Sequence, residues 1–275
     1  MDNITYLENA KFQKLTELNL LFNKIKDINV LEKVKFPSLK KLVLSDNYIC
    51  DIKVLKNVNF PYLEKLALSN NRIKDLNILS EVDFSSLREL KLSGNEISDL
   101  SFLENKNNCF SKLEVLLLSN NKIKNIDIFR EKDRFKDLEE LQLCGNEIDS
   151  IDALSESPLE KLKMLKLSKN KIIDITALKN NSFKNLEQLD LFDNQIKNIE
   201  VFNETKFNEN IKELDLSYNC LESIEVLVEN KNFPKLKDLN IEGNSNLDYT
   251  NKNEDIKKLF NNYGIDYTFN PIIKK

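Results

Sequence analysis

The stretch LVLSDNYICDI, residues 42–52, decides the fold because the chain repeats it. The same pattern returns as LALSNNRIKDL at residues 66–76 and as LKLSGNEISDL at residues 90–100. Leu at alternating positions has the two-residue period of a short strand, with one side facing a core and the other facing solvent. One such unit cannot cover its own apolar side, so the pattern predicts units stacked into a solenoid.

An Asn that follows each strand marks ten units, spaced 24 to 26 residues apart. Where a strand ends, backbone groups turn away from the sheet without partners, and an amide side chain offers both donors and an acceptor. We therefore expect these residues to form a structural ladder along the stack. They are Asn23, Asn47, Asn71, Asn95, Asn121, Asn146, Asn170, Asn194, Asn219 and Asn244.

The residue before the marker Asn belongs in most units to a type that tolerates a left-handed backbone, which indicates a tight turn. These residues are Asp46, Asn70, Gly94, Asn120, Gly145, Asp193 and Gly243. The outer segments, such as residues 29–39 and 176–186, favour one or two helical turns. They also carry aromatic residues in register, which we expect to form a spine in the core: Phe12, Phe36, Phe60, Phe84, Phe110, Phe135, Phe183 and Phe233.

The complete phrase, L-x-x-L-x-L-x-x-N-x-I, resembles the leucine-rich repeat, and the resemblance covers nearly the whole chain. Its continuation, I-x-D-I-x-x-L, is most similar to repeats of the protein phosphatase 1 regulatory subunit and of bacterial internalins, although the units here are longer. The resemblance implies an α/β fold. It would be a right-handed, horseshoe-like solenoid with a parallel sheet on the concave side and short helical or 3-10 segments on the convex side.

The two ends of the chain depart from the repeat. ITYLENAKF at residues 4–12 is in phase with INVLEKVKF at residues 28–36, so the chain opens inside a unit. Residues 253–270 carry apolar residues at helix-like spacing, which indicates a cap. We expect an N-terminal half-repeat at residues 1–12, ten repeats at residues 13–246 and a C-terminal capping segment at residues 247–275.

The composition and charge of the chain bear on its cellular location and on the kind of partner it can bind. The chain has 275 residues and a net charge of −4, so its overall charge does not favour nucleic acid as a partner. We expect no membrane association, because no leader-like segment or long apolar run is present. The widely spaced Cys50, Cys109, Cys144 and Cys220 indicate free thiols. The predicted location is therefore the cytoplasm.

The sequence gives little support for catalysis or for a cofactor or metal. It contains no His, which removes the usual base of nucleophilic catalysis and the commonest metal ligand. One set of carboxylates recurs four residues after the marker Asn and is better explained as turn residues than as a catalytic acid and base. These are Asp27, Asp51, Asp75, Asp99 and Asp174. We expect a protein that is not an enzyme.

The strand positions that the repeat leaves free differ from unit to unit, as the residues of a recognition surface do. In the last three units they gather acidic residues beside two aromatic ones, which suits a basic protein segment. The alternative is an ordinary solvated charge cluster. The candidate partner-binding residues there are Asp190, Phe192, Asp193, Glu213, Asp215 and Tyr218, with Asp238 and Glu242 nearby.

Two further features of the same surface lie outside the last three units. Val115, Leu117 and Met164 are apolar strand residues near the middle of the array, and we count them as candidate contacts. The first units carry basic residues, which predict a basic end that could orient a partner or merely balance charge. They are Lys40, Lys41, Lys65 and Arg72.

These features predict a non-enzymatic scaffold or adaptor that holds a protein partner, with a basic segment, on its concave face. We expect the protein to be monomeric on its own. One alternative is a regulatory subunit of a phosphatase or another enzyme. A second is a recognition domain from a larger protein, which the start inside a unit keeps open.

Overall fold

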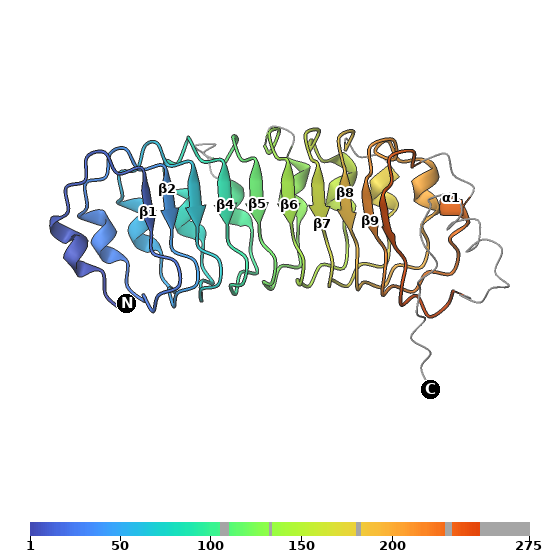
Figure 1. Ribbon diagram of the computed structural model, residues 1–275, viewed down its shortest axis with the longest axis horizontal. Coiled ribbons are helices and arrows are strands. Elements are labelled where there is room, and N and C mark those ends of the chain that lie inside the picture. The colour runs from blue at the N-terminus through green and yellow to red at the C-terminus, as the bar shows by residue number, and fades with distance from the viewer. Residues whose placement is uncertain (105–109, 132–133, 180–182, 229–232, 248–275) are drawn as a thin grey trace.

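The computed structural model describes residues 1–104, 110–131, 134–179, 183–228 and 233–247, and it has the form of an elongated stack of coils (Figure 1). Each coil places one short strand on the front of the stack and returns along the back. We number the coils by their strands. The repeat predicted from the sequence is therefore confirmed as a solenoid with a parallel sheet.

Ten strands form one parallel sheet, and their order in the sheet is their order in the chain. Neighbouring strands pair without any shift of register, so equivalent residues of successive coils lie side by side. The strands are β1 (Glu17–Asn19), β2 (Lys41–Val43), β3 (Lys65–Ala67), β4 (Glu89–Lys91), β5 (Val115–Leu117), β6 (Glu140–Gln142), β7 (Met164–Lys166), β8 (Gln188–Asp190), β9 (Glu213–Asp215) and β10 (Asp238–Asn240).

The back of the stack consists of 3-10 helices of four or five residues and one short α-helix (Figure 1). They are η1 (Thr5–Asn9), η2 (Asn29–Glu32), η3 (Lys53–Lys56), η4 (Asn77–Ser80), η5 (Ser101–Glu104), η6 (Asp127–Arg130), η7 (Asp152–Glu156), η8 (Thr176–Lys179), η9 (Glu200–Asn203) and α1 (Glu225–Val228). In coil 2, Asp51 accepts the backbone N–H of Lys53 at 2.8 Å. Asp27, Asp75, Asp99 and Asp174 make the same contact, which confirms their expected role as turn residues.

A single apolar core fills the space between the sheet and the helices. The middle residue of each strand points inward, and Leu42, Leu66 and Leu90 are completely buried there. The aromatic spine is confirmed at seven of its eight predicted positions, which are all buried. Phe12 is the exception, since 54% of it is exposed. It stacks on Phe36 at 5.9 Å, and no earlier coil of this chain covers its other face.

The marker Asn residues form the expected ladder. The side-chain N–H of Asn121 donates to the carbonyl of Leu118 in its own coil at 3.0 Å and to that of Leu92 in the preceding coil at 3.1 Å. Its oxygen accepts the N–H of Ile97 in the preceding coil at 3.0 Å. In the first coil, the side chain of Asn23 bonds within the described chain only to the carbonyls of Leu20 and Leu21 in its own coil. The ladder therefore fastens each coil to the one before it.

The residue before each marker Asn has a left-handed backbone in all ten coils. The prediction is confirmed at the seven Gly, Asn and Asp positions. The same left-handed conformation also occurs at three residues whose side chains disfavour it. These are Phe22 with φ of 55°, Lys169 with φ of 55° and Tyr218 with φ of 53°. The turn is therefore imposed by the fold even where the local sequence opposes it.

The N-terminal half-unit packs as an additional turn. Ile4 and Leu7 in and beside η1 are buried against the first complete coil. The predicted C-terminal capping segment, including its helix-like stretch, lies outside the described residues apart from Leu247, which is buried. Within the described chain, no helix has the length and apolar character needed to cross a bilayer.

Candidate functional site

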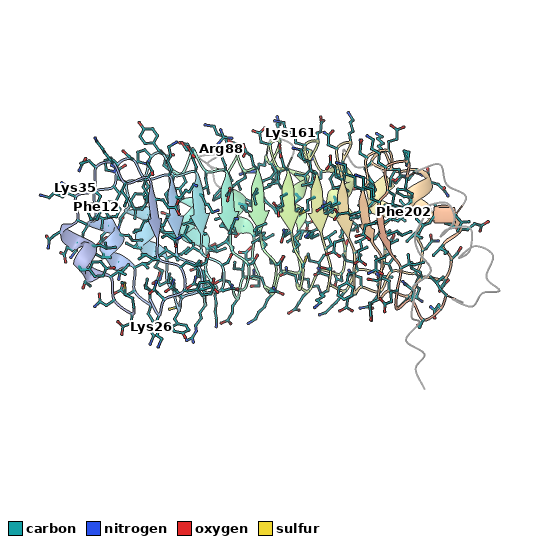
Figure 2. The ribbon with its side chains drawn as sticks, viewed as in Figure 1. Phe12, Lys26, Lys35, Arg88, Lys161 and Phe202 are labelled. Atoms are coloured by element: carbon teal, nitrogen blue, oxygen red, sulfur yellow. The ribbon has the colours of Figure 1, made fainter. Side chains whose placement is uncertain are left out.

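Most charged side chains on the edges of the sheet are paired with the neighbouring coil. Along one edge, Lys40 lies 2.9 Å from Glu64, and Lys163 lies 2.8 Å from Glu139. Arg88 pairs with Glu114 on the same edge. Figure 2 labels Arg88 and Lys161 along the upper edge of the molecule, in different coils. Because the coils stack in register, a charge in one coil meets the equivalent residue of the next.

The solvent-exposed side of the sheet, called the strand face below, consists of the first and third residue of each strand. Its N-terminal part is electrically compensated. Lys41 lies 3.9 Å from Glu17, and Glu89 lies 2.9 Å from Lys65 and 3.5 Å from Lys91. Burial would raise the pKa of Glu89, but hydrogen bonds from the two lysines and their charges outweigh it and lower the pKa.

The predicted basic end of the molecule is therefore largely neutralised. Lys40, Lys41 and Lys65 each pair with a carboxylate from an adjacent coil. The guanidinium of Arg72 lies over the ring of Tyr48, 4.7 Å from its centre. The expectation of a basic-to-acidic gradient holds only for its acidic end.

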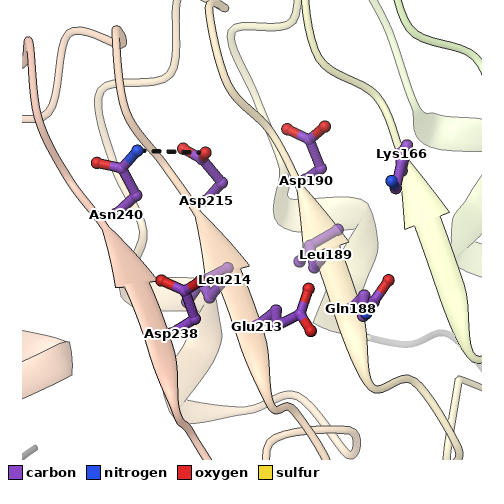
Figure 3. A pocket seen from close by; sticks show the side chains of 9 residues that line it. All are labelled: Lys166, Gln188, Leu189, Asp190, Glu213, Leu214, Asp215, Asp238 and Asn240. Atoms are coloured by element: carbon purple, nitrogen blue, oxygen red, sulfur yellow. Dashed lines mark hydrogen bonds between the residues drawn. The ribbon is translucent and has the colours of Figure 1, made fainter.

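At the C-terminal end of the sheet, the strand face and the turns that follow its strands carry what we call the acidic patch: Asp190, Asp193, Glu213, Asp215, Asp238 and Glu242. Figure 3 shows four of these carboxylates around a shallow hollow of about 230 Å³, with Lys166 and Asn240 at its margins. Within the described chain, none of the six forms an ion pair with a Lys or Arg. The acidic patch is thus a cluster of carboxylates that no cation of the described chain compensates, unlike the paired charges of the first strands.

The register of the sheet places like charges next to each other in this patch. Asp190 of β8 is the register partner of Asp215 in β9, and Glu213 of β9 is the partner of Asp238 in β10. Carboxylates on neighbouring strands repel each other and reduce stability. A cation bound between them would remove this repulsion.

Two of the carboxylates also hold the backbone of the turn that follows them. Asp190 accepts the N–H of Phe192 at 3.0 Å, and Asp215 accepts the N–H of Ser217 at 2.9 Å. Asn240 occupies the same position in coil 10 and accepts the N–H of Glu242 at 3.1 Å. An amide therefore serves this turn as well as a carboxylate does, so the turn does not require the negative charge.

An aromatic pair borders the acidic patch. The rings of Phe192 and Tyr218 meet edge to face with their centres 5.4 Å apart. Phe192 is half-buried, whereas 44% of Tyr218 is exposed. The ammonium of Lys169 lies over the ring of Phe192 at 5.7 Å. Sequence reasoning missed Lys169, although its unusual position before a marker Asn was a signal that could have drawn attention to it.

The structure brings the predicted acidic and aromatic residues together, but it separates the apolar candidates of the middle coils. Val115 and Leu117 lie on β5, whereas Met164 lies on β7. Between them, Glu140 and Gln142 of β6 interrupt the apolar surface. All three apolar residues are half-buried, and they do not form one continuous patch.

The chain matches several models of one protein family. The model described as "Leucine Rich repeats (2 copies)" matches residues 4–57, 63–105 and 111–156. Two further models, each described as "Leucine rich repeat", match residues 136–196 and 207–223. Together these matches cover most of the chain. A search of curated protein sequences finds no significant match.

Solved structures with the same architecture are numerous. Internalin C2 from Listeria monocytogenes is 29% identical over 70% of this chain and 78% of its own, with a TM-score of 0.59. A leucine-rich repeat protein from Leptospira interrogans is 26% identical over 83% of this chain and 55% of its own, with a TM-score of 0.67. The plant peptide hormone receptor RGFR1, solved in complex with RGF2, is 19% identical over 83% of this chain and 40% of its own, with a TM-score of 0.58.

Proposed function

Because the chain belongs to the leucine-rich repeat family, we propose that it is a non-catalytic protein-binding module that holds its partner on the strand face. The family builds long, open surfaces of this kind from stacked coils. The receptor RGFR1, which shares the fold, was solved in complex with RGF2, which is consistent with a binding role. We place the contact on coils 8 to 10.

The observation that carries this proposal is the uncompensated charge of the acidic patch. In the N-terminal coils, Glu17 and Glu89 are each matched by a lysine of an adjacent strand. In coils 8 to 10, Asp190 and Asp215 face each other without such a match. A partner segment rich in Lys or Arg would supply the missing charge and would be steered to this end of the solenoid.

The aromatic pair supplies a second part of the binding energy. Aromatic and Arg side chains dominate the energy of many protein interfaces, and ion pairs at the rim contribute mainly to association rate and specificity. Phe192 and Tyr218 are already packed against each other, so little side-chain entropy is lost when a partner covers them. We therefore propose that the carboxylates attract the basic partner and that the two rings supply most of the binding energy once it is in contact.

A direct test uses two fluorescein-labelled peptides of eight residues, one alternating Arg with Ser and the other alternating Glu with Ser. Fluorescence anisotropy would measure their binding to the full chain. We expect the basic peptide to bind and its affinity to fall about tenfold or more between roughly 50 and 300 mM salt, because the contact is ionic. Equal binding of both peptides, or no binding of the basic one, would contradict the proposal.

A further inference from the structure

Three aromatic side chains on the turns and strand ends are both accessible and close to charged residues, and two of them carry a cation from their own chain. Arg72 covers Tyr48 at 4.7 Å, and Lys169 covers Phe192 at 5.7 Å. Tyr218 is the third. Within the described residues no Lys or Arg lies over its ring, although 44% of the side chain is exposed beside the acidic patch.

We propose that Tyr218 binds the guanidinium of an arginine in the partner, in the way that Tyr48 is covered by Arg72. This inference rests on the proposed function and names the side chain beside the acidic patch that would contact the partner. A cation over an aromatic ring is attracted by the negative face of the ring, and the attraction grows as water is excluded. Asp190 and Asp215, in the same two coils as the aromatic pair, would accept the N–H groups of the guanidinium.

The ring of Tyr218 is held in a fixed orientation. One of its neighbours is Gly243, where an added Cβ would meet ring atoms at 2.9 Å, so only glycine leaves room for the ring. The rings of Tyr218 and Phe192 also meet edge to face, with their centres 5.4 Å apart. These contacts restrict the ring, so its exposed part can bind a partner with less loss of entropy than a free side chain would suffer.

The turn does not require an aromatic residue at position 218. The φ of Tyr218, 53°, lies in the left-handed region, where seven of the ten coils use Gly, Asn or Asp. An aromatic residue strains this turn, as Phe22 also does in the first coil, so the ring of Tyr218 does not serve the backbone. Asn70 and Asn120 show that an unstrained residue fits the same turn.

Arginine fits this site better than lysine does. The guanidinium is planar, so it stacks on a ring while its fork of N–H groups reaches a carboxylate, whereas an ammonium is a compact and strongly hydrated point charge. Tyr48 provides an example within the chain, because the guanidinium of Arg72 lies over its ring at 4.7 Å.

The test compares two labelled peptides of eight residues, in which Ser alternates either with Arg or with Lys, on the full chain by fluorescence anisotropy. The expected result is a Kd about three- to tenfold lower for the Arg peptide. Tyr218→Asn should remove this preference, and Tyr218→Phe should keep it because the ring remains. Phe22→Asn is the matched control, since it makes the same change at the same turn position in the first coil, and it should leave both affinities unchanged.

The outcomes separate this inference from the proposed function. If both peptides bind the unmodified protein equally, or if Tyr218→Asn keeps the preference for Arg, the assignment of Tyr218 is wrong while a basic partner remains supported. If neither peptide binds, the basic partner is wrong and the inference falls with it. Thermal unfolding of Tyr218→Asn should show an unchanged or higher Tm, which separates a lost contact from a damaged fold.

Discussion

The two sides of the sheet follow different rules. On the core side, the coils after the first repeat nearly the same Leu and Asn contacts, and Asn121 differs little from Asn47 or Asn194. On the strand face, equivalent positions carry residues as different as Val115 and Glu213. Coils that stack in register must carry similar residues where they share a core. The strand face is not under this constraint, so its residues can differ from coil to coil and determine which partner is recognised.

The strand face itself divides into two parts. In coils 1 to 4 its charges are balanced by partners from neighbouring strands, and in the described part of coils 8 to 10 they are not. Balanced charges stabilise the stack slightly and have little attraction for a ligand. The unbalanced part is less favourable for the stack and more favourable for a charged partner. Each prediction below tests one side of these comparisons.

The largest effect should come from the core side. Asn121→Ala leaves the buried N–H of Ile97 without its acceptor and removes one of the Asn donors to the carbonyls of Leu92 and Leu118, and we expect the free energy of unfolding to fall by about 3 kcal/mol. Asn23→Ala should lower it by only about 1 kcal/mol, because within the described chain the side chain of Asn23 bonds only to its own coil. Urea denaturation would measure both. Equal losses would show that the ladder does not fasten coil to coil.

The next effect concerns binding and leaves the fold intact. Asp190→Asn with Asp215→Asn keeps an acceptor for the turn, as Asn240 does naturally, and removes two charges. We expect affinity for the Arg–Ser peptide to fall about tenfold, which corresponds to about 1.4 kcal/mol. Glu17→Gln on β1 removes a charge from the balanced part and should leave affinity unchanged. A fall of the same size in this control would place the binding site elsewhere.

A smaller effect should appear at a strained turn outside the acidic patch. Phe22→Asn replaces an aromatic residue that is 76% exposed and left-handed with one that tolerates this backbone. We expect the free energy of unfolding to rise by about 1 kcal/mol. Phe22→Ala keeps the strain and should give no comparable gain. If both variants gave the same stability, the strain argument for Tyr218 would lose its support.

The smallest effect should be the pH dependence of the stability that Glu89 contributes in the charge-balanced part of the strand face. The pKa of Glu89 is lowered in the folded protein, because its two lysines outweigh the effect of burial. Its contribution is therefore present above the unfolded pKa of about 4.3 and is lost as pH falls through the folded pKa. For this partly exposed group we expect about 0.3 kcal/mol. Glu89→Gln should be less stable than the unmodified protein at neutral pH, and the difference should vanish in acid; a constant difference would contradict this.

The repeating fold could be predicted well from the sequence, because each coil is determined by the same residue types at the same positions. The role of Asp51 as a turn residue and the turn at Asp46 follow from the residue types alone. The charge pairs could not be predicted in the same way. Whether Lys65 is free or bound to Glu89 depends on side-chain geometry between coils, which residue type does not determine.

The candidate site residues remain a prediction, and the structure tests only how they are arranged. The period of the repeat placed Asp190 beside Asp215, and the structure confirmed this proximity. The same period also counted Met164 with Val115, although a polar strand lies between them. The support that Gly243 gives to the ring of Tyr218 was invisible, since it depends on how the ring lies across the next coil.

The most direct test of the account maps where a basic peptide touches the solenoid. The Arg–Ser peptide would carry a benzoylphenylalanine at its centre, and mass spectrometry would identify the cross-linked residues after irradiation. The account predicts cross-links within coils 8 to 10, around Phe192, Asp215 and Tyr218. Cross-links concentrated on the helical back, or on the balanced strand face of coils 1 to 4, would contradict it.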